Sequence, residues 1–399
     1  MGWAKEQAMI IEERGFDDID KYVCEDCIKD PYLKNWIHNN GSTDICDYCG
    51  EENVVVSMTD LMTEFIMPTF KKYYDYAVEW LGWESAEGGY QGTTYDNEEI
   101  VTDFSDDISS NMDVINDIIE SMHDKLWCKN DPYGLTERER CEYSWKNFSN
   151  LVKYQNRYFF LQEKDDTEYY EKYSPLSILN LIEENAKNLN LIKNLPKNSD
   201  LYRARIFKKG QNIVLDGANL GSPPKEFAKN DRMSASGISA FYGSEDKRIC
   251  IKEVLNSNLT VEDIIVAGKF NNINEVKYLD LSEINKIELP SIFDNDKYEL
   301  RETIIFLKNL NKELTRPINE LKQIEYVPTQ IFAEYFKLVA VLQGIKYNSS
   351  KDSTGTCFVL FFDNEQCICD ENKCSILKKC ELKLIDTSTY QLTLHNNSS

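Results

Sequence analysis

Histidine is scarce in this sequence of 399 residues, because His38, His123 and His395 are the only three. None of them has a second histidine or a glutamate nearby at the spacing that metal sites use. We therefore do not expect histidine-based acid–base catalysis or a histidine-ligated metal.

Long apolar runs and an excess of positive charge are also missing. No stretch approaches the roughly 20 consecutive apolar residues that cross a bilayer, and the opening MGWAKEQAMIIEE has no apolar signal core. Lys and Arg number 45 against 68 Asp and Glu, so the formal net charge is −23. Such a chain is not expected to bind nucleic acid or an anionic membrane by bulk attraction. We expect a cytoplasmic protein whose twelve cysteines are thiols or metal ligands.

The remaining composition is that of a large folded protein. Hydrophobic residues make up 42% and aromatic residues 12%, and at roughly 150 residues per domain the length predicts two or three domains. Changes in sequence pattern along the chain predict three domains. They are a zinc-binding ribbon over 17–55, a helical bundle over 56–195 and an α+β domain over 196–390.

Four cysteines form the clearest motif near the start of the chain. Cys24 and Cys27 make one CxxC pair, and Cys46 and Cys49 make a second after eighteen intervening residues. This spacing is typical of ribbons that hold one tetrahedral zinc ion. A closed four-cysteine site has no open position for substrate, so the predicted zinc is structural. A metal-free reduced loop and a redox role are the alternatives.

Periodic apolar residues predict helices in the middle of the chain. Helical spacing runs over 58–81 with a kink at Pro68, then over 100–126, and twice more before Pro196. Beyond Pro196, short apolar runs between Gly, Asn and Asp predict strands. Ser244 and Thr329 are the expected N-caps of two helices among these strands. The predicted fold class is α+β.

The segment 201–254 opposes the charge of the whole chain. It holds ten Lys and Arg against six Asp and Glu, a local balance of +4. A basic island suits a small polyanion such as a diphosphate, for which arginine offers a fork of donors. The alternative is a solvated face of unpaired lysines.

The motifs of the C-terminal half resemble those of RES-domain toxins. They are, in order, Leu-Tyr-Arg203-Ala-Arg, Asp-Arg232-Met-Ser-Ala-Ser-Gly237-Ile-Ser-Ala-Phe-Tyr242, Lys-Glu253-Val, Pro-Thr-Gln330 and Gln-Gly344-Ile-Lys-Tyr-Asn-Ser349-Ser350. The resemblance covers about 196–385. It implies an ADP-ribosyltransferase-like α+β fold that takes NAD as substrate and breaks its nicotinamide–ribose bond, by hydrolysis or phosphorolysis.

The resemblance also implies roles for individual residues. The three residues that name the family would be Arg203, Glu253 and Ser349, with Ser350 as a less fitting alternative to Ser349. Arg203 and Arg232 would hold the diphosphate, Tyr242 would stack on the nicotinamide or its ribose, and Ser349 would hydrogen-bond the ribose or amide. Glu253 would stabilise the oxocarbenium-like transition state. Each residue also has a plain structural interpretation, such as a surface carboxylate, a rim ion pair, a core aromatic or a loop hydroxyl.

Three features depart from the family pattern. Asp231 stands where the family usually has glycine before the second arginine, and 247–252 (KRICIK) replaces a helix of small residues. A long insertion separates Glu253 from Ser349.

The front half resembles the HEPN-type domain found ahead of some RES domains. The aromatic residues of Trp145-Lys-Asn-Phe148 and of Tyr-Phe159-Phe160 carry this likeness. HEPN ribonucleases use Arg-x4-His, but the positions before His123 and His38 hold Ile118 and Leu33. We therefore expect regulation, sensing or dimerisation, and no nuclease activity.

Cys367, Cys369, Cys374 and Cys380 cluster near the end with uneven spacing, which favours buried thiols over a second metal site.

The predicted function is an NAD-degrading toxin or anti-phage effector, controlled by its front half. The alternatives are an ADP-ribosyltransferase that modifies a macromolecule and a catalytically weak nucleotide-binding scaffold. An antitoxin or regulatory protein and a second copy of the chain are the candidate protein partners.

Overall fold

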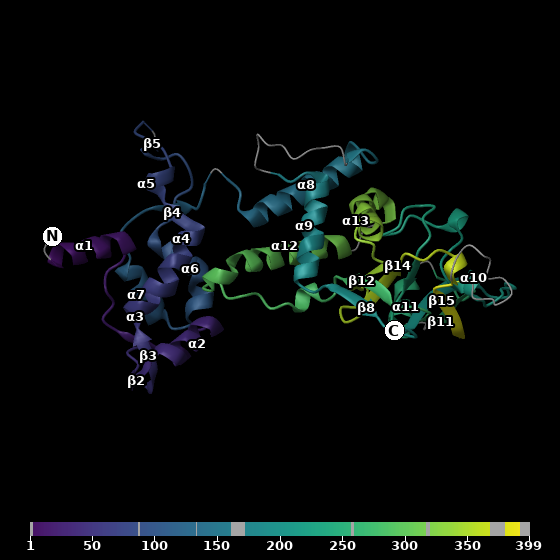
Figure 1. The fold of residues 1–399 in the computed structure, drawn as a ribbon, viewed down its shortest axis with the longest axis horizontal. Helices are drawn as coiled ribbons and strands as arrows, with labels where there is room; N and C mark the ends of the chain where they lie inside the picture. Colours follow the sequence, from purple (N-terminus) through teal and green to yellow (C-terminus); the bar gives the residue numbers. More distant parts are fainter. Residues whose placement is uncertain are drawn as a thin grey trace, which may run out of the picture. The chain divides into compact units, whose positions relative to one another are not determined.

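The computed structural model describes residues 3–86, 88–132, 134–160, 172–256, 259–316, 320–367 and 380–391. Their contacts divide the chain into two units (Figure 1). The first comprises Met1–Thr136 and Leu289–Thr303, and the second comprises Glu137–Glu288 and Ile304–Ser399. Helices and sheets occur in both units, which confirms the expected α+β class. None of the described helices has the length and apolar character needed to cross a membrane.

The cysteine segment of the first unit forms a small antiparallel sheet. Its strands lie in the order β1 (Tyr22–Cys24), β3 (Glu52–Ser57), β2 (Ser42–Ile45). Between β1 and β2 runs helix α2 (Pro31–Asn40), which begins at Asp30. The Asp30 side chain accepts two N–H groups of the first turn, as an N-cap does.

Besides α2, the first unit contains the helices α1 (Trp3–Arg14), α3 (Met58–Leu61), α4 (Met67–Tyr73), α5 (Ala77–Trp80), α6 (Asn97–Ile108) and α7 (Met112–Ser121). The predicted continuous helix over 58–81 is wrong at 74–76, and the chain is helical again in α5. After Tyr73 the chain enters strand β4 (Tyr74–Tyr76), which pairs with β7 (Trp127–Lys129) and packs the Tyr76 ring 4.5 Å from that of Trp127. This tertiary pairing outweighs the local helical periodicity. The expected kink at Pro68 takes the form of a wider π-helical turn, η2 (Met62–Ile66).

The predicted helix over 100–126 is likewise two helices, because Asn111 caps a fresh start at α7. A short hairpin of β5 (Trp83–Glu84) and β6 (Gly89–Tyr90) completes the described strands of this unit. Its core gathers fully buried aromatic residues such as Phe16 and Phe70. Phe293, from the insertion between Glu253 and Ser349, is 0% exposed in the same core. Part of the insertion therefore completes the first unit.

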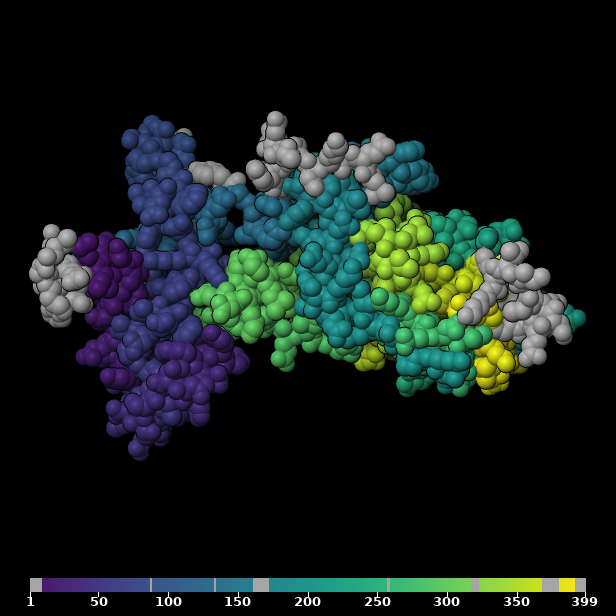
Figure 2. Space-filling model, in the orientation of Figure 1, coloured from purple at the N-terminus to yellow at the C-terminus, as the bar shows by residue number. Residues whose placement is uncertain are grey.

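The helices of the second unit are α8 (Glu137–Tyr154), α9 (Pro175–Asn188), α10 (Gly217–Leu220), α11 (Lys247–Val254), α13 (Val327–Leu338) and, from Ile304 onward, α12 (Tyr298–Thr315). Helix α13 lies beside α8 and α9 (Figures 1 and 2). The contact units thus separate α8 and α9 from the helices before them. The domain boundaries expected at 55/56 and 195/196 stay predictions.

Two sheets form the rest of the second unit. One has the order β10 (Phe241–Gly243), β14 (Thr356–Leu360), β13 (Gly344–Asn348), β12 (Val276–Asp280), β8 (Ile192–Leu195). The other has the order β15 (Leu382–Gln391), β11 (Asp263–Asn272), β9 (Asp200–Lys208). Only β12 and β13 pair in parallel among these described strands.

The two sheets meet where β9 passes the end of β10. Tyr202 and Ser244 exchange both main-chain hydrogen bonds there, at 2.7 and 2.9 Å. Neither of the two expected N-caps, Ser244 and Thr329, is found. Helix α11 is capped by Asp246, whose carboxylate accepts the N–H of Arg248, because the Ser244 backbone is engaged in the bridge. Helix α13 begins after Tyr326, so Thr329 lies within its first turn.

Candidate active site and metal site

A pocket of about 290 Å3 opens where the two sheets of the second unit meet. Residues of β9, β10, α11, β13 and β14 line it. Three of the residues expected from the sequence, Arg203, Tyr242 and Glu253, lie in its wall. The fold therefore brings together side chains that are up to fifty positions apart in the sequence.

Glu253 and Ser349 form a direct hydrogen bond at this pocket. Glu253 is next to the last residue of α11, and Ser349 follows β13 at once. The Ser349 hydroxyl donates to Glu253 Oε1 and accepts the backbone N–H groups of Lys351 at 3.1 Å and Asp352 at 3.2 Å. Ser349 is 7% exposed. Three hydrogen bonds thus fix the hydroxyl and, through it, one carboxylate oxygen.

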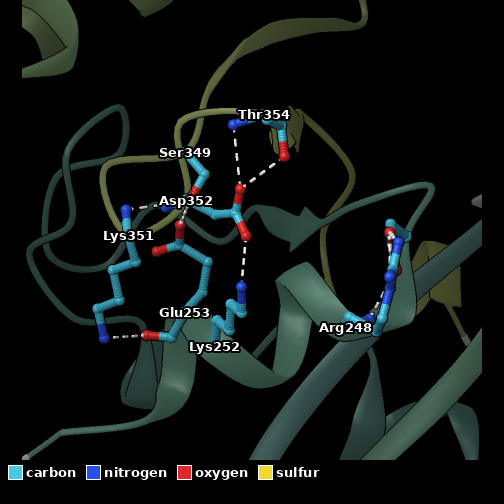
Figure 3. Close-up of polar contacts among 8 residues, drawn as sticks. Arg248, Lys252, Glu253, Ser349, Lys351, Asp352 and Thr354 are labelled. Atoms are coloured by element: carbon cyan, nitrogen blue, oxygen red, sulfur yellow. Dashed lines mark hydrogen bonds and ion pairs between the residues drawn. The ribbon is translucent and has the colours of Figure 1, made fainter.

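Two lysines tie the loop after β13 to α11 (Figure 3). Lys351 Nζ donates to the main-chain oxygens of Glu253 at 2.7 Å and Leu255 at 2.5 Å. A cation at this position satisfies carbonyls that the helix end leaves unpaired. Lys252 Nζ lies 2.5 Å from Asp352 Oδ2 and holds the pKa of that carboxyl well below its usual range. The loop and the helix end therefore form one hydrogen-bonded assembly around Glu253.

Arg203 reaches the pocket from β9. Its Nη1 donates to the Tyr242 main-chain oxygen at 3.0 Å, and its guanidinium carbon lies 5.5 Å from the centre of the Phe241 ring. Burial lowers the pKa of Arg203, but a guanidinium stays protonated at neutral pH. The site thus contains a fixed positive charge at one wall and the Glu253 carboxylate at another.

Tyr242 lines the pocket, and hydrogen bonds hold its hydroxyl. The hydroxyl shares a 2.9 Å hydrogen bond with Ser234 Oγ and accepts the Met233 N–H at 3.2 Å. Burial raises the pKa of Tyr242. The phenol therefore stays neutral, with its hydroxyl already hydrogen-bonded.

Arg232 is not among the residues that line this pocket. Its Nη1 donates to the main-chain oxygens of Leu314 at 2.9 Å and Arg316 at 2.8 Å, at the C-terminal end of α12. The insertion before Ser349 supplies both acceptors. The structure thus joins Arg203, Tyr242, Glu253 and Ser349 but leaves Arg232 bound to a helix end.

Other residues of the pocket were not singled out from the sequence for this role. Asp231 lines it on a loop that Gln330 Nε2 holds by a 2.8 Å hydrogen bond to the Asp231 main-chain oxygen. Tyr347 and Cys357 face each other across β13 and β14, and the Cys357 thiol lies 3.6 Å from Glu253 Oε1. Burial raises the pKa of both Tyr347 and Cys357. Strand alternation could have predicted Tyr347 at the site. It precedes Ser349 by two residues, and residues two apart on a strand lie on the same face.

The four cysteines of the two CxxC pairs converge as their spacing predicts. All four Sγ atoms of Cys24, Cys27, Cys46 and Cys49 lie within 4.8 Å of one another. Cys24 and Cys49 are 3.7 Å apart, and Cys27 and Cys46 are 3.8 Å apart. A tetrahedral zinc with Zn–S bonds of about 2.3 Å separates its sulfurs by roughly 3.8 Å. The cluster therefore has the chemistry and dimensions of a metal site.

The cysteines near the end of the chain differ among themselves. Cys367 is a buried free thiol, whereas Cys380 is disulfide-bonded. The expectation that all cysteines are thiols or metal ligands is therefore wrong at Cys380. Cys369 and Cys374 lie outside the described residues.

Comparisons with known proteins agree with both halves of this architecture. The model of the RES domain matches residues 200–375, and that of HEPN/RES N-terminal domain 1 matches residues 39–166. A comparison with curated proteins gives no match. Among solved structures, the chain is similar to one in the crystal structure of the M. tuberculosis MbcT-MbcA toxin-antitoxin complex. The two share 13% sequence identity over 52% of this chain and 93% of that one, with a TM-score of 0.29. By these two matches, the chain contains a RES domain, with HEPN/RES N-terminal domain 1 ahead of it.

Proposed function

We propose that the second unit degrades NAD by breaking its nicotinamide–ribose bond. The observation that carries this proposal is the Ser349–Glu253 hydrogen bond beside a pocket that also holds Arg203 and Tyr242. All four residues lie within the segment that matches the RES domain. The acceptor of the ribosyl group is water or inorganic phosphate, which makes the enzyme an NAD glycohydrolase or an NAD phosphorylase.

The chemistry needs little beyond these side chains. The C1′–N bond breaks with its electron pair leaving on nicotinamide, and the ribose develops oxocarbenium character. The Glu253 carboxylate stabilises that positive charge, and Ser349 holds the carboxylate in one orientation. An oxygen of water or phosphate then bonds to C1′ and releases its proton to solvent or to Glu253. Arg203 binds the diphosphate, and the Tyr242 ring packs on the nicotinamide or its ribose.

The first unit is proposed to control this activity in a toxin or anti-phage effector. Its cysteine cluster would hold one structural zinc, with no open position for chemistry. The zinc would stabilise the small β1–β3–β2 sheet, whose strands have few buried residues of their own. An antitoxin, a regulatory protein or a second copy of the chain would restrain the toxin.

The test is NAD loss by the purified full chain, with and without inorganic phosphate. We expect free nicotinamide from the wild type and at least about a 100-fold lower rate for Glu253→Gln, since the carboxylate acts on developing charge. Glu226→Gln, an exposed residue of the same unit, is the matched control and should keep wild-type activity. A phosphate requirement would identify phosphorolysis.

Asp231 favours one alternative, a catalytically weak nucleotide-binding scaffold. A carboxylate at the wall of an NAD pocket opposes the negative charge of the diphosphate. Saturable NAD binding without nicotinamide release would support that scaffold. Transfer of labelled ADP-ribose to a macromolecule would indicate a transferase instead.

A further inference from the structure

Arg205 follows Arg203 and Ala204 on β9. Those two residues line the pocket, and Arg205 is not among its lining residues. Arg203 and Arg205 are separated by one position, so their side chains leave the same face of the strand. Leu201 and Phe207, on that same face, pack with Leu220 and Phe241 in the core between the sheets. The Nε atoms of both arginines are sealed from solvent and have no hydrogen-bond partner.

No acidic side chain pairs with either arginine among the residues that the structure describes. Their hydrogen-bond acceptors are main-chain oxygens, of Tyr242 for Arg203 and of Gly221, at 2.5 Å, for Arg205. Burial and the neighbouring charge of Arg203 lower the pKa of Arg205 to about 10. Both groups are thus positive at neutral pH. Asp231 lines the same pocket and acts electrostatically on Arg203, but it forms no ion pair with either arginine. Two adjacent, partly buried cations without a directly paired counter-ion are unfavourable unless an anion binds them.

We infer that Arg203 and Arg205 together form a subsite for two adjacent phosphate groups. This inference rests on the proposed function where it concerns NAD, and it adds Arg205 as a residue that determines specificity. Each guanidinium offers a planar fork of donors that matches phosphate oxygens. A diphosphate brings negative charge to both arginines, whereas a single phosphate satisfies only one. The site is therefore expected to favour NAD over nicotinamide mononucleotide.

The test is binding of inorganic pyrophosphate and of inorganic phosphate to the full chain, by titration calorimetry at constant ionic strength. We expect the wild type to bind pyrophosphate at least about tenfold more tightly than phosphate. Arg205→Met should remove most of that preference, and Arg205→Lys should retain part of it. Arg248→Met is the control, because Arg248 is 85% exposed and paired with Asp246 on α11. It should bind as the wild type does.

Thermal melting of each variant separates loss of binding from loss of folding. If Arg205→Met does not fold, the binding measurements on Arg205→Lys test the inference. Equal affinity for pyrophosphate in the wild type and a folded Arg205 variant would overturn the inference. So would a wild type that binds phosphate and pyrophosphate equally well. Arg205-dependent pyrophosphate binding without NAD loss would instead uphold the subsite and refute the proposed function. With NAD as substrate, Arg205→Lys should raise KM by several-fold and leave kcat nearly unchanged.

Discussion

The hydroxyl of Ser349 donates a hydrogen bond to Glu253 Oε1 and receives two backbone N–H groups of its own loop. The serine therefore connects the loop after β13 to the carboxylate at the end of α11. Its neighbour Ser350 is exposed. This pair of adjacent serines makes a matched comparison.

Ser349→Ala should lower the rate of NAD loss by about 10- to 100-fold. Hydrogen bonds to charged groups contribute roughly 1.5–3 kcal/mol, and this one orients Glu253. Ser350→Ala should leave the rate unchanged. Initial-rate measurements of both variants at saturating NAD would check this, and the reverse ranking would mean that Ser350 is the functional serine.

Lys351→Met should destabilise the second unit by about 1 kcal/mol and lower kcat. The ammonium group satisfies two carbonyls at the end of α11, and its loss frees the loop that holds Ser349. Urea unfolding and steady-state kinetics would measure the two effects. Lys351→Arg should recover most of both. The control Lys209→Met removes an exposed lysine of the same unit, and an equal loss there would deny Lys351 a positioning role.

The Asp263–Lys208 pair should make stability depend on pH in the acidic range. These residues face each other across β11 and β9, with Oδ1 and Nζ 2.6 Å apart. Lys208 and Thr260 lower the pKa of Asp263 from 3.8 to about 2. The stabilisation is therefore fully present above about pH 4 and is lost as the pH falls through about 2. Asp263→Asn should be less stable than the wild type at pH 6, and the difference should shrink toward pH 2. Denaturant unfolding at both pH values is the measurement, and a constant difference would contradict the assignment.

Removal of the metal should destabilise the first unit, which contains the cysteine cluster. The purified chain should carry one zinc per molecule by native mass spectrometry, and chelation should lower the melting temperature of this unit. Cys46→Ser should lose the metal because three ligands remain. Cys128→Ser alters a buried thiol outside the cluster and should keep it. A full metal content in Cys46→Ser would rule out the four-cysteine site.

The sequence predicted which residues lie close together better than it predicted the boundaries of helices. The order of Arg203, Tyr242, Glu253 and Ser349 predicted a common site, and the fold brings these residues together. The hydrogen bonds of Arg232 could not be predicted from the sequence. Their acceptors are main-chain oxygens of the insertion, which carries no recognisable motif. The apolar periodicity over 58–81 predicted a helix at 74–76. Those residues instead form a strand that pairs with β7. Ser244 was predicted to be an N-cap, but its backbone pairs with Tyr202 in the structure.

The fully buried Phe293 has a consequence for the order in which the chain becomes complete. During synthesis, Arg203 and Glu253 leave the ribosome before Phe293, and Ser349 leaves it after. Until residue 293 emerges, the core of the first unit lacks Phe293, which is one of its fully buried aromatic residues. The first unit can therefore close its core while the pocket still lacks its serine. On the growing chain, the first unit can be complete before the pocket of the second unit has all of its residues.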